Sequence, residues 1–246
     1  MRYYEILTEA EVEPYKLDVV DNTPDNVQKI LNTYCKEAES SGFLSFPIWR
    51  GFKTLVDPVV LIDPSTGIRK AQNSSNHYNL LMDNSPYIPG WPKRTRSLIA
   101  ASNMRVARSY GTVYKLIPFD GVKIAVCATE DIWFTGIDLK PELPFTGEIE
   151  ILNSFLISKL GFPNKVKTFD EMIRYTGYPD IAKRLKLLNS PLKPEEVIPF
   201  IQSRMAPDEM GLRLMSVSEY ASARPESREV WFSGPCLAIK HFELGK

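Results

Sequence analysis

The sequence contains very little histidine and cysteine. Among its 246 residues are two histidines, His77 and His241, and three cysteines, Cys35, Cys127 and Cys236. No Cys/His cluster has the spacing of a zinc site, so no metal is expected. The odd number and wide spacing of the cysteines indicate buried thiols in a reducing compartment rather than a disulfide framework. If the chain is an enzyme, we expect carboxylates, arginine and serine to supply its chemistry.

Long apolar runs are also absent. No stretch approaches the ~18 apolar residues that a membrane helix needs, so no membrane partner is expected. Residues 1–9 carry charge and lack both an apolar core and a small-residue cleavage site. This argues against a signal peptide and for a cytoplasmic protein, and these residues are expected to form a strand or a short tail. Neither a Gly-x-Gly-x-x-Gly motif after a strand nor a Walker loop is present, which disfavours Rossmann dehydrogenases and P-loop enzymes.

Acidic residues are missing from one long stretch of the chain. The formal net charge is zero, which gives no general argument for binding nucleic acid. Between Asn84 and Phe119, however, there is no Asp or Glu, while the basic residues there are Lys93, Arg94, Arg96, Arg105, Arg108 and Lys115. Such a basic window suggests an anionic ligand. The alternative is a solvated basic face that pairs with acids from elsewhere.

The first half of the chain is expected to combine helix and strand. Thr23 as N-cap and Pro24 at the first helical position predict a helix over 24–35, with Gly42 just past its end. Residues 43–52 are expected to be extended, because Pro47 excludes a helix interior. A strand is expected at 59–62, and residues 63–95 are expected to be a long irregular connection.

The second half is expected to alternate between strands and a block of helices. A strand at 96–102, a helix at 104–110, and strands at 112–119 and 122–127 come first, the last two joined by an Asp120-Gly121 hairpin. A helical insert is expected at approximately 145–206. Its helix-start signals are Thr146, a capping box at Thr168, Pro179 and Pro194. Strands at 212–217, 229–232 and 236–242 complete a single α+β domain.

Three short segments carry the candidate chemistry. Arg50 lies within the otherwise apolar stretch Ile48–Gly51. A buried arginine is costly unless it meets an anion, and its planar fork fits a phosphate or a carboxylate. The alternative is an ion pair with an acid in the core.

The other two segments contain serine and glutamate. Residues 97–103 form a strand with Ser97 and Ser102 at its ends, followed by Asn103, and small residues here would let a ligand approach the backbone. Ser102 also suits the N-cap of the next helix. Glu229 is expected at the start of a strand on the same face as Trp231. There it would suit an electrostatic catalyst, although a lone edge-strand glutamate is more often a gatekeeper charge.

Taken together, these segments resemble the mono-ADP-ribosyltransferase family, in its Arg–Ser–Glu subclass of the phage or toxin type. The matching motifs are Trp49-Arg50-Gly51, the serine strand 97–102 with Ala107 and Gly111 after it, and Arg228-Glu229-Val230-Trp231. The stretch 92–99, with Tyr110-Gly111 and Asp131-Ile132-Trp133, is also similar to phage-encoded proteins of this type. The resemblance covers roughly 43–133 and 212–242.

The resemblance implies a split β-sheet core, at approximately 43–133 plus 207–246, and NAD as co-substrate. NAD would lie between the strands of Arg50 and Glu229, and the catalytic residues would be Glu229, Arg50 and Ser102. The residues implied to bind NAD are Arg50, Gly51, Ser97, Ser102, Asn103 and Tyr110; Tyr110 or Tyr114 would stack on nicotinamide. A macromolecular acceptor, protein or nucleic acid, would receive the ADP-ribose, in the host cytoplasm if the chain is phage-encoded.

The chain departs from the family pattern in two places. The usual Ser-Thr-Ser triplet is Ala100-Ala101-Ser102, and the acceptor-selecting position two before the catalytic glutamate is Ser227, which disfavours arginine as acceptor. A literal Glu-x-Glu occurs at Glu148 and Glu150, but helical periodicity places it at a helix start, where the dipole favours acids. Glu229 is therefore preferred.

Two alternative functions stay open. One is an NAD glycohydrolase that uses the same site with water as acceptor. The other is a non-catalytic phage protein that binds nucleic acid or a host factor through the basic window, here taken as residues 93–115.

Overall fold

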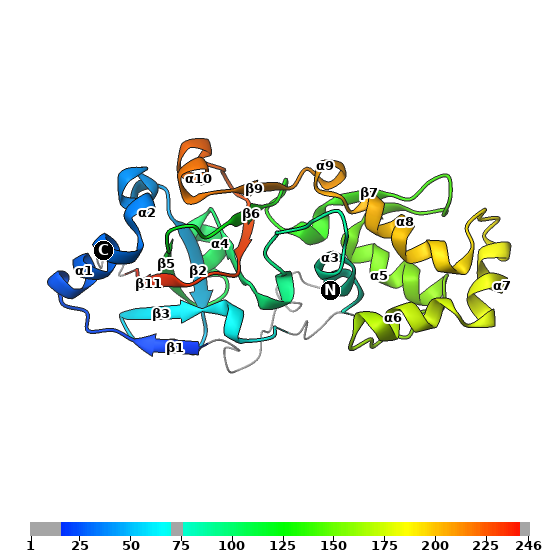
Figure 1. Ribbon diagram of the computed structural model, residues 1–246, viewed down its shortest axis with the longest axis horizontal. Helices are drawn as coiled ribbons and strands as arrows, with labels where there is room; N and C mark the ends of the chain where they lie inside the picture. The colour runs from blue at the N-terminus through cyan, green and yellow to red at the C-terminus, as the bar shows by residue number, and fades with distance from the viewer. Residues whose placement is uncertain (1–15, 70–75, 242–246) are drawn as a thin grey trace. The chain divides into compact units, whose positions relative to one another are not determined.

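The computed structural model describes residues 16–69 and 76–241, and the part expected at 1–9 lies outside them (Figure 1). The chain divides into two compact units. As far as it is described, the first unit takes in Met1–Gln72, Trp91–Glu130 and Leu214–Lys246. The second takes in Asn73–Gly90 and Asp131–Arg213. Within the described ranges, no helix has both the length and the apolar character needed to cross a bilayer.

A nine-stranded, mostly antiparallel sheet forms the centre of the first unit, so the expected α+β class is confirmed. Its strand order is β1-β3-β11-β5-β2-β4-β10-β6-β9. The strands are β1 (Lys16–Val19), β2 (Ile48–Phe52), β3 (Val59–Asp63), β4 (Leu98–Ala101), β5 (Thr112–Pro118), β6 (Ile124–Val126), β9 (Arg213–Met215), β10 (Glu229–Phe232) and β11 (Cys236–Lys240).

The three strands at the centre of interest are neighbours in this sheet. β4 pairs with β10 along its length, from Glu229↔Ala101 to Phe232↔Leu98. β2 pairs with β5 through five residue pairs but with β4 through one, Trp49↔Ala101. The sheet is therefore weakly joined between β2 and β4.

Short helices cover the sheet of the first unit. They are α1 (Pro24–Tyr34), α2 (Lys36–Ser40), α4 (Met104–Arg108) and α10 (Val217–Ala223), with 3₁₀ turns η2 (Phe43–Ser45), η3 (Pro64–Thr66) and η4 (Arg94–Arg96). α1 begins at Pro24 as predicted, and it ends at Tyr34 before α2. The core beneath them includes Phe43, Phe52 and Phe232, all without exposed surface. The three cysteines are free and buried, which confirms the expected thiols.

The second unit is mainly helical and contains the expected insert. Its elements are α3 (His77–Asp83), η5 (Ile132–Phe134), the paired strands β7 (Gly136–Asp138) and β8 (Thr146–Glu148), then α5 (Ile149–Ser158), α6 (Phe169–Thr176), α7 (Pro179–Leu187), η6 (Pro194–Glu196), α8 (Val197–Arg204) and α9 (Pro207–Met210). Thr168 caps α6 as predicted, because its Oγ1 accepts a hydrogen bond from the Glu171 N–H at 3.1 Å.

Three expectations about local structure were wrong. β5 and β6 form no hairpin: Val122 N–H donates to the Phe119 carbonyl in a turn, but β6 then pairs with β10 while β5 lies between β11 and β2. Residues 63–95 are not wholly irregular, since α3 forms and buries its Leu80-Leu81-Met82 run. α5 begins at Ile149 rather than after Thr146, because residues 146–148 pair with β7.

Candidate functional site

Arg50 is a buried cation on β2. Arg50 is 6% exposed, and its Nη1 donates a hydrogen bond to the carbonyl oxygen of Ile99 on β4. The side chain thus reaches the backbone of the strand to which β2 is weakly joined. Burial lowers the pKa of Arg50 to about 9, as does nearby Arg69, while Tyr110 and Glu229 act in the opposite direction. The guanidinium therefore stays charged at neutral pH.

Glu229 is the first residue of β10 and forms a buried ion pair with Arg94. Glu229 Oε1 lies 2.5 Å from Arg94 Nη1, and the two residues are 7% and 4% exposed. Arg94 Cζ lies 4.9 Å from the centroid of the Trp231 ring. The strand position predicted for Glu229 is confirmed, and it alternates onto the same face as Trp231. In the sequence, Arg94 is distinguished only as a member of the basic window, and no local pattern there predicts this pair.

Ser102 follows β4 and extends its ladder with β10 by one residue. Its N–H donates to the Arg228 carbonyl at 2.9 Å, and its Oγ accepts from the Arg228 N–H at 2.8 Å. Burial raises the pKa of the Tyr220 hydroxyl, and the neighbouring side chain of Ser102 acts in the opposite direction. Ser102 is therefore linked to Glu229 through the backbone of residue 228, while the residue opposite Glu229 on β4 is Ala101.

Asn103, and not Ser102, caps helix α4, so that expectation was wrong. Asn103 Oδ1 accepts from the Arg105 N–H at 2.9 Å, and its Nδ2 donates to Ser227 Oγ at 2.8 Å. Asn103 thereby ties the start of α4 to the loop before Glu229. Ser97, at the other end of the strand, is fully buried, and its hydroxyl donates to the Lys93 carbonyl at 2.6 Å.

Gly51 is required by packing against α4. A Cβ atom at this position would lie 2.1 Å from the Ala107 carbonyl oxygen. Gly111, which follows α4, has a φ of +131°, and a Cβ atom there would lie 2.5 Å from the Phe52 carbonyl oxygen. These glycines let α4 lie on β2, which places Tyr110 near enough to Arg50 to influence its charge. Tyr114, by contrast, is a core residue whose hydroxyl donates to the carbonyls of Leu55 and Asp57.

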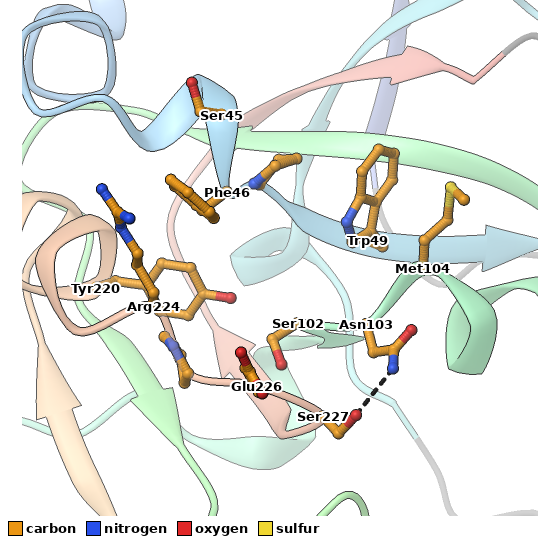
Figure 2. A pocket seen from close by; sticks show the side chains of 12 residues that line it. Ser45, Phe46, Trp49, Ser102, Asn103, Met104, Tyr220, Arg224, Glu226 and Ser227 are labelled. Atoms are coloured by element: carbon orange, nitrogen blue, oxygen red, sulfur yellow. Dashed lines mark hydrogen bonds between the residues drawn. The ribbon is translucent and has the colours of Figure 1, made fainter.

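A pocket of about 490 Å³ adjoins Ser102 and the loop that leads to Glu229. In Figure 2, Trp49 and Met104 lie on one side of it and Phe46 and Arg224 on the other, with the hydroxyl of Tyr220 directed inward. The lining residues are Ser45, Phe46, Pro47, Trp49, Ser102, Asn103, Met104, Tyr220, Arg224, Pro225, Glu226 and Ser227.

The loop that borders this pocket has an unusual backbone. Arg224 and Ser227 have φ values of 47° and 46°, a region that side-chain-bearing residues seldom occupy. Arg224 is held there with its Cζ 4.1 Å from the centroid of the Phe46 ring. Residues with such backbone angles cluster at functional sites. Arg224 is the C-cap of α10, and Ser227 lies two residues before Glu229.

The rival acidic pair lies in the second unit. Glu148 precedes α5 at the N-cap position, and Glu150 is in the first turn of that helix, as predicted. Glu229 is the glutamate that shares a sheet with Arg50.

The basic window does not form one solvated face. Arg94 is buried, and Lys115 is half-buried with its Nζ donating to the Leu44 carbonyl at 2.6 Å. Its exposed members are Lys93, Arg96, Arg105 and Arg108. Over residues 16–69 and 76–241, no three His, Cys, Asp or Glu side chains are grouped so as to hold a metal ion.

Known proteins add no identification to this geometry. No family model, no curated protein and no solved structure matches the chain. The fold and the site define an α+β protein with a nine-stranded sheet and a buried cluster of arginine and glutamate.

Proposed function

We propose that the chain is an NAD-dependent mono-ADP-ribosyltransferase. The observation that carries the proposal is the arrangement of Arg50, Ser102 and Glu229 on three neighbouring strands of one sheet: Arg50 lies on β2, Ser102 directly follows β4, and Glu229 begins β10. These residues lie far apart in the sequence, and the sequence motifs alone predict each of them. Only one residue pair joins β2 to β4, and the Arg50 side chain crosses this junction to the Ile99 carbonyl. This weak junction is consistent with the split sheet that the resemblance implies.

The charge at this position suits a dinucleotide. Arg69, Tyr110 and Glu229 lie close enough to Arg50 to influence its pKa, and Arg94 contacts Glu229 directly. The guanidinium groups of Arg50 and Arg94 are buried. Arginine is the side chain best suited to bind a pyrophosphate through paired hydrogen bonds.

Glu229 would act on the ribose that carries nicotinamide. Cleavage breaks the bond between C1′ and the nicotinamide nitrogen, and nicotinamide leaves with the bonding electron pair. The ribose ring then resembles an oxocarbenium ion, which a fixed carboxylate stabilises. An acceptor nucleophile attacks C1′ and loses its proton, which completes the transfer of ADP-ribose. With water in that place, the same site would act as an NAD glycohydrolase.

The pocket beside Ser102 and Ser227 supports a bulky acceptor rather than water alone. It combines aromatic walls with hydroxyl groups, and it adjoins the loop before Glu229. An acceptor group of a protein or nucleic acid would fit such a mixed surface. The rival idea of a binding protein that uses residues 93–115 is weakened, because Arg94 and Lys115 are engaged inside the fold.

The test is nicotinamide release from NAD by the purified full chain, with and without cell lysate as acceptor. Arg50→Ala and Glu229→Ala should each lower the rate by about 10³-fold, since each removes a charged group from the reacting region. The matched control Glu148→Ala/Glu150→Ala removes the rival pair and should keep wild-type activity. The proposal would be refuted by a wild-type protein that releases no nicotinamide and shows no rise in Tm when NAD is added. Nucleic-acid binding that is unaffected by NAD and weakens steeply with rising salt concentration would favour a nucleic-acid-binding protein instead.

A further inference from the structure

On strand β4, the residue directly opposite Glu229 has no polar side chain. The register pairs Glu229 with Ala101, one residue before the serine of the motif. The hydroxyl of Ser102 instead accepts a hydrogen bond from the Arg228 N–H at 2.8 Å. Ser102 therefore fixes the backbone before Glu229, and a donor to the carboxylate comes from a segment outside β4 and β10.

Arg94 is a donor in direct contact with that carboxylate. Its Nη1 lies 2.5 Å from Glu229 Oε1, and the side chains are 4% and 9% exposed. A hydrogen bond between two charged groups is short and strong, and burial removes the competition of water. The position of Arg94 thus determines where this carboxylate oxygen lies.

Arg94 is itself held firmly. Its guanidinium lies over Trp231, whose Nε1 donates to the Pro92 carbonyl at 2.9 Å. The turn η4, which carries Arg94, is stabilised by a hydrogen bond of 2.6 Å that the Ser97 hydroxyl donates to the Lys93 carbonyl. Trp231 and Glu229 lie on the same face of β10. The Arg94 guanidinium therefore packs against the strand that carries the carboxylate.

We propose that Arg94 is the positioning residue for Glu229, and that it supplies the side-chain contact for which Ala101 has no polar group. The proposal rests on the proposed function. Arg94 takes no part in bond making or breaking; it holds the carboxylate in the place where positive charge develops on the ribose. Its contribution is therefore made in the transition state, through Glu229, and not in the binding of NAD.

The test compares variants within one 3₁₀ turn. Arg94→Met removes the buried donor, and Arg96→Met removes the exposed arginine two residues later and serves as the matched control. For nicotinamide release, Arg94→Met should lower kcat about 100-fold and change KM for NAD less than about threefold. Arg94→Lys should recover part of the loss, because it keeps a charged donor without the fork. Arg96→Met should match wild type.

A double variant separates positioning from a merely structural role. If Arg94 acts through Glu229, then Arg94→Met/Glu229→Gln should be no slower than Glu229→Gln alone. Multiplicative losses in the double variant would overturn the inference. A rise of about tenfold in KM with kcat unchanged would do so too, because it would make Arg94 a ligand of NAD.

The remaining outcomes distinguish this inference from the proposed function. If Arg94→Met does not fold, Arg94→Lys decides, and wild-type kcat in that variant would overturn the inference. An active wild type whose Arg94 variants keep full kcat would overturn the inference and leave the transferase intact. A wild type that neither releases nicotinamide nor gains thermal stability with NAD would overturn both.

Discussion

The two units of the chain bury different kinds of polar group. The buried charged side chains described in the first unit, Arg50, Arg94 and Glu229, lie together around β2 and β10. In the second unit the buried polar side chains described are uncharged apart from Asp131, which caps η5 through the Trp133 N–H at 2.9 Å; the others are His77, Ser85, Thr135, Asn153, Thr176 and Gln202. Because a buried charge costs far more than a buried neutral group, the comparison supports the first unit as the location of the proposed function.

The largest expected effect tests this comparison directly. Arg50→Met should lower kcat/KM for nicotinamide release by about 10³-fold, because a neutral side chain cannot hold an anion in a buried site. Its counterpart in the second unit is Arg204→Met, which removes a half-exposed arginine 3.9 Å from Glu142. Steady-state kinetics of both variants provide the measurement. An equal loss in Arg204→Met would break the distinction between the units.

A glycine pair compares the packing of the two units. Gly51→Ala should destabilise the first unit by about 3 kcal/mol, since its methyl group would meet the Ala107 carbonyl at 2.1 Å. Gly136→Ala in the second unit meets nothing within 4 Å and should change the free energy of unfolding by less than about 0.5 kcal/mol. Urea denaturation checks both variants. A Gly51→Ala variant of wild-type stability would contradict the close approach of α4 to β2.

Acid should weaken the second unit through His77. Burial lowers the pKa of His77 from its ordinary 6.5 to about 4, so the unfolded chain binds this proton more readily than the folded one. The contribution of neutral His77 to the free energy of unfolding is complete above the pKa that His77 has in the unfolded chain. This contribution is lost as the pH falls from there toward the pKa of His77 in the folded chain. Between pH 7 and pH 5 it should decrease by about 2 kcal/mol. Unfolding curves at both pH values measure this, and His77→Leu should lose that part of the pH dependence.

The smallest expected effect sharpens the comparison by reporting on the first unit alone. All three cysteines belong to that unit, and burial raises the pKa of the Cys35 thiol to about 12. Because the thiolate is the reactive form, a thiol reagent at pH 8 should label the native protein hardly at all. Labelling should follow unfolding in urea. Rapid labelling of native Cys35 would contradict its burial.

Much of the site could be predicted because its parts are local patterns. Each of three patterns can be recognised within a few residues of sequence. They are the apolar run that forms β2, the small residues of β4 and the alternation of side chains around Glu229. Gly51 could be singled out in the same way, although its reason is the packing of α4 rather than contact with a ligand.

Two features could not be predicted because they depend on pairing between distant segments. The turn at Asp120-Gly121 is real, yet β6 joins β10, a strand that appears in the sequence long afterward. The pair of Arg94 and Glu229 spans 135 residues, so no local pattern contains it. One signal did exist: with no acid between Asn84 and Phe119, any acidic partner of a buried arginine there had to come from outside this window.

The pairing of β4 with β10 has a consequence for the order of events during folding. Ser102 and Arg228 meet across 126 residues, with most of the second unit between them in the chain. Contacts of such wide separation form late, because a long loop must first be closed. The arginine of β2 and the serine after β4 can therefore be in place while the glutamate is still absent. Under the proposed function, a chain in which β10 has not yet joined the sheet would release no nicotinamide, and the activity would arise together with the completed sheet.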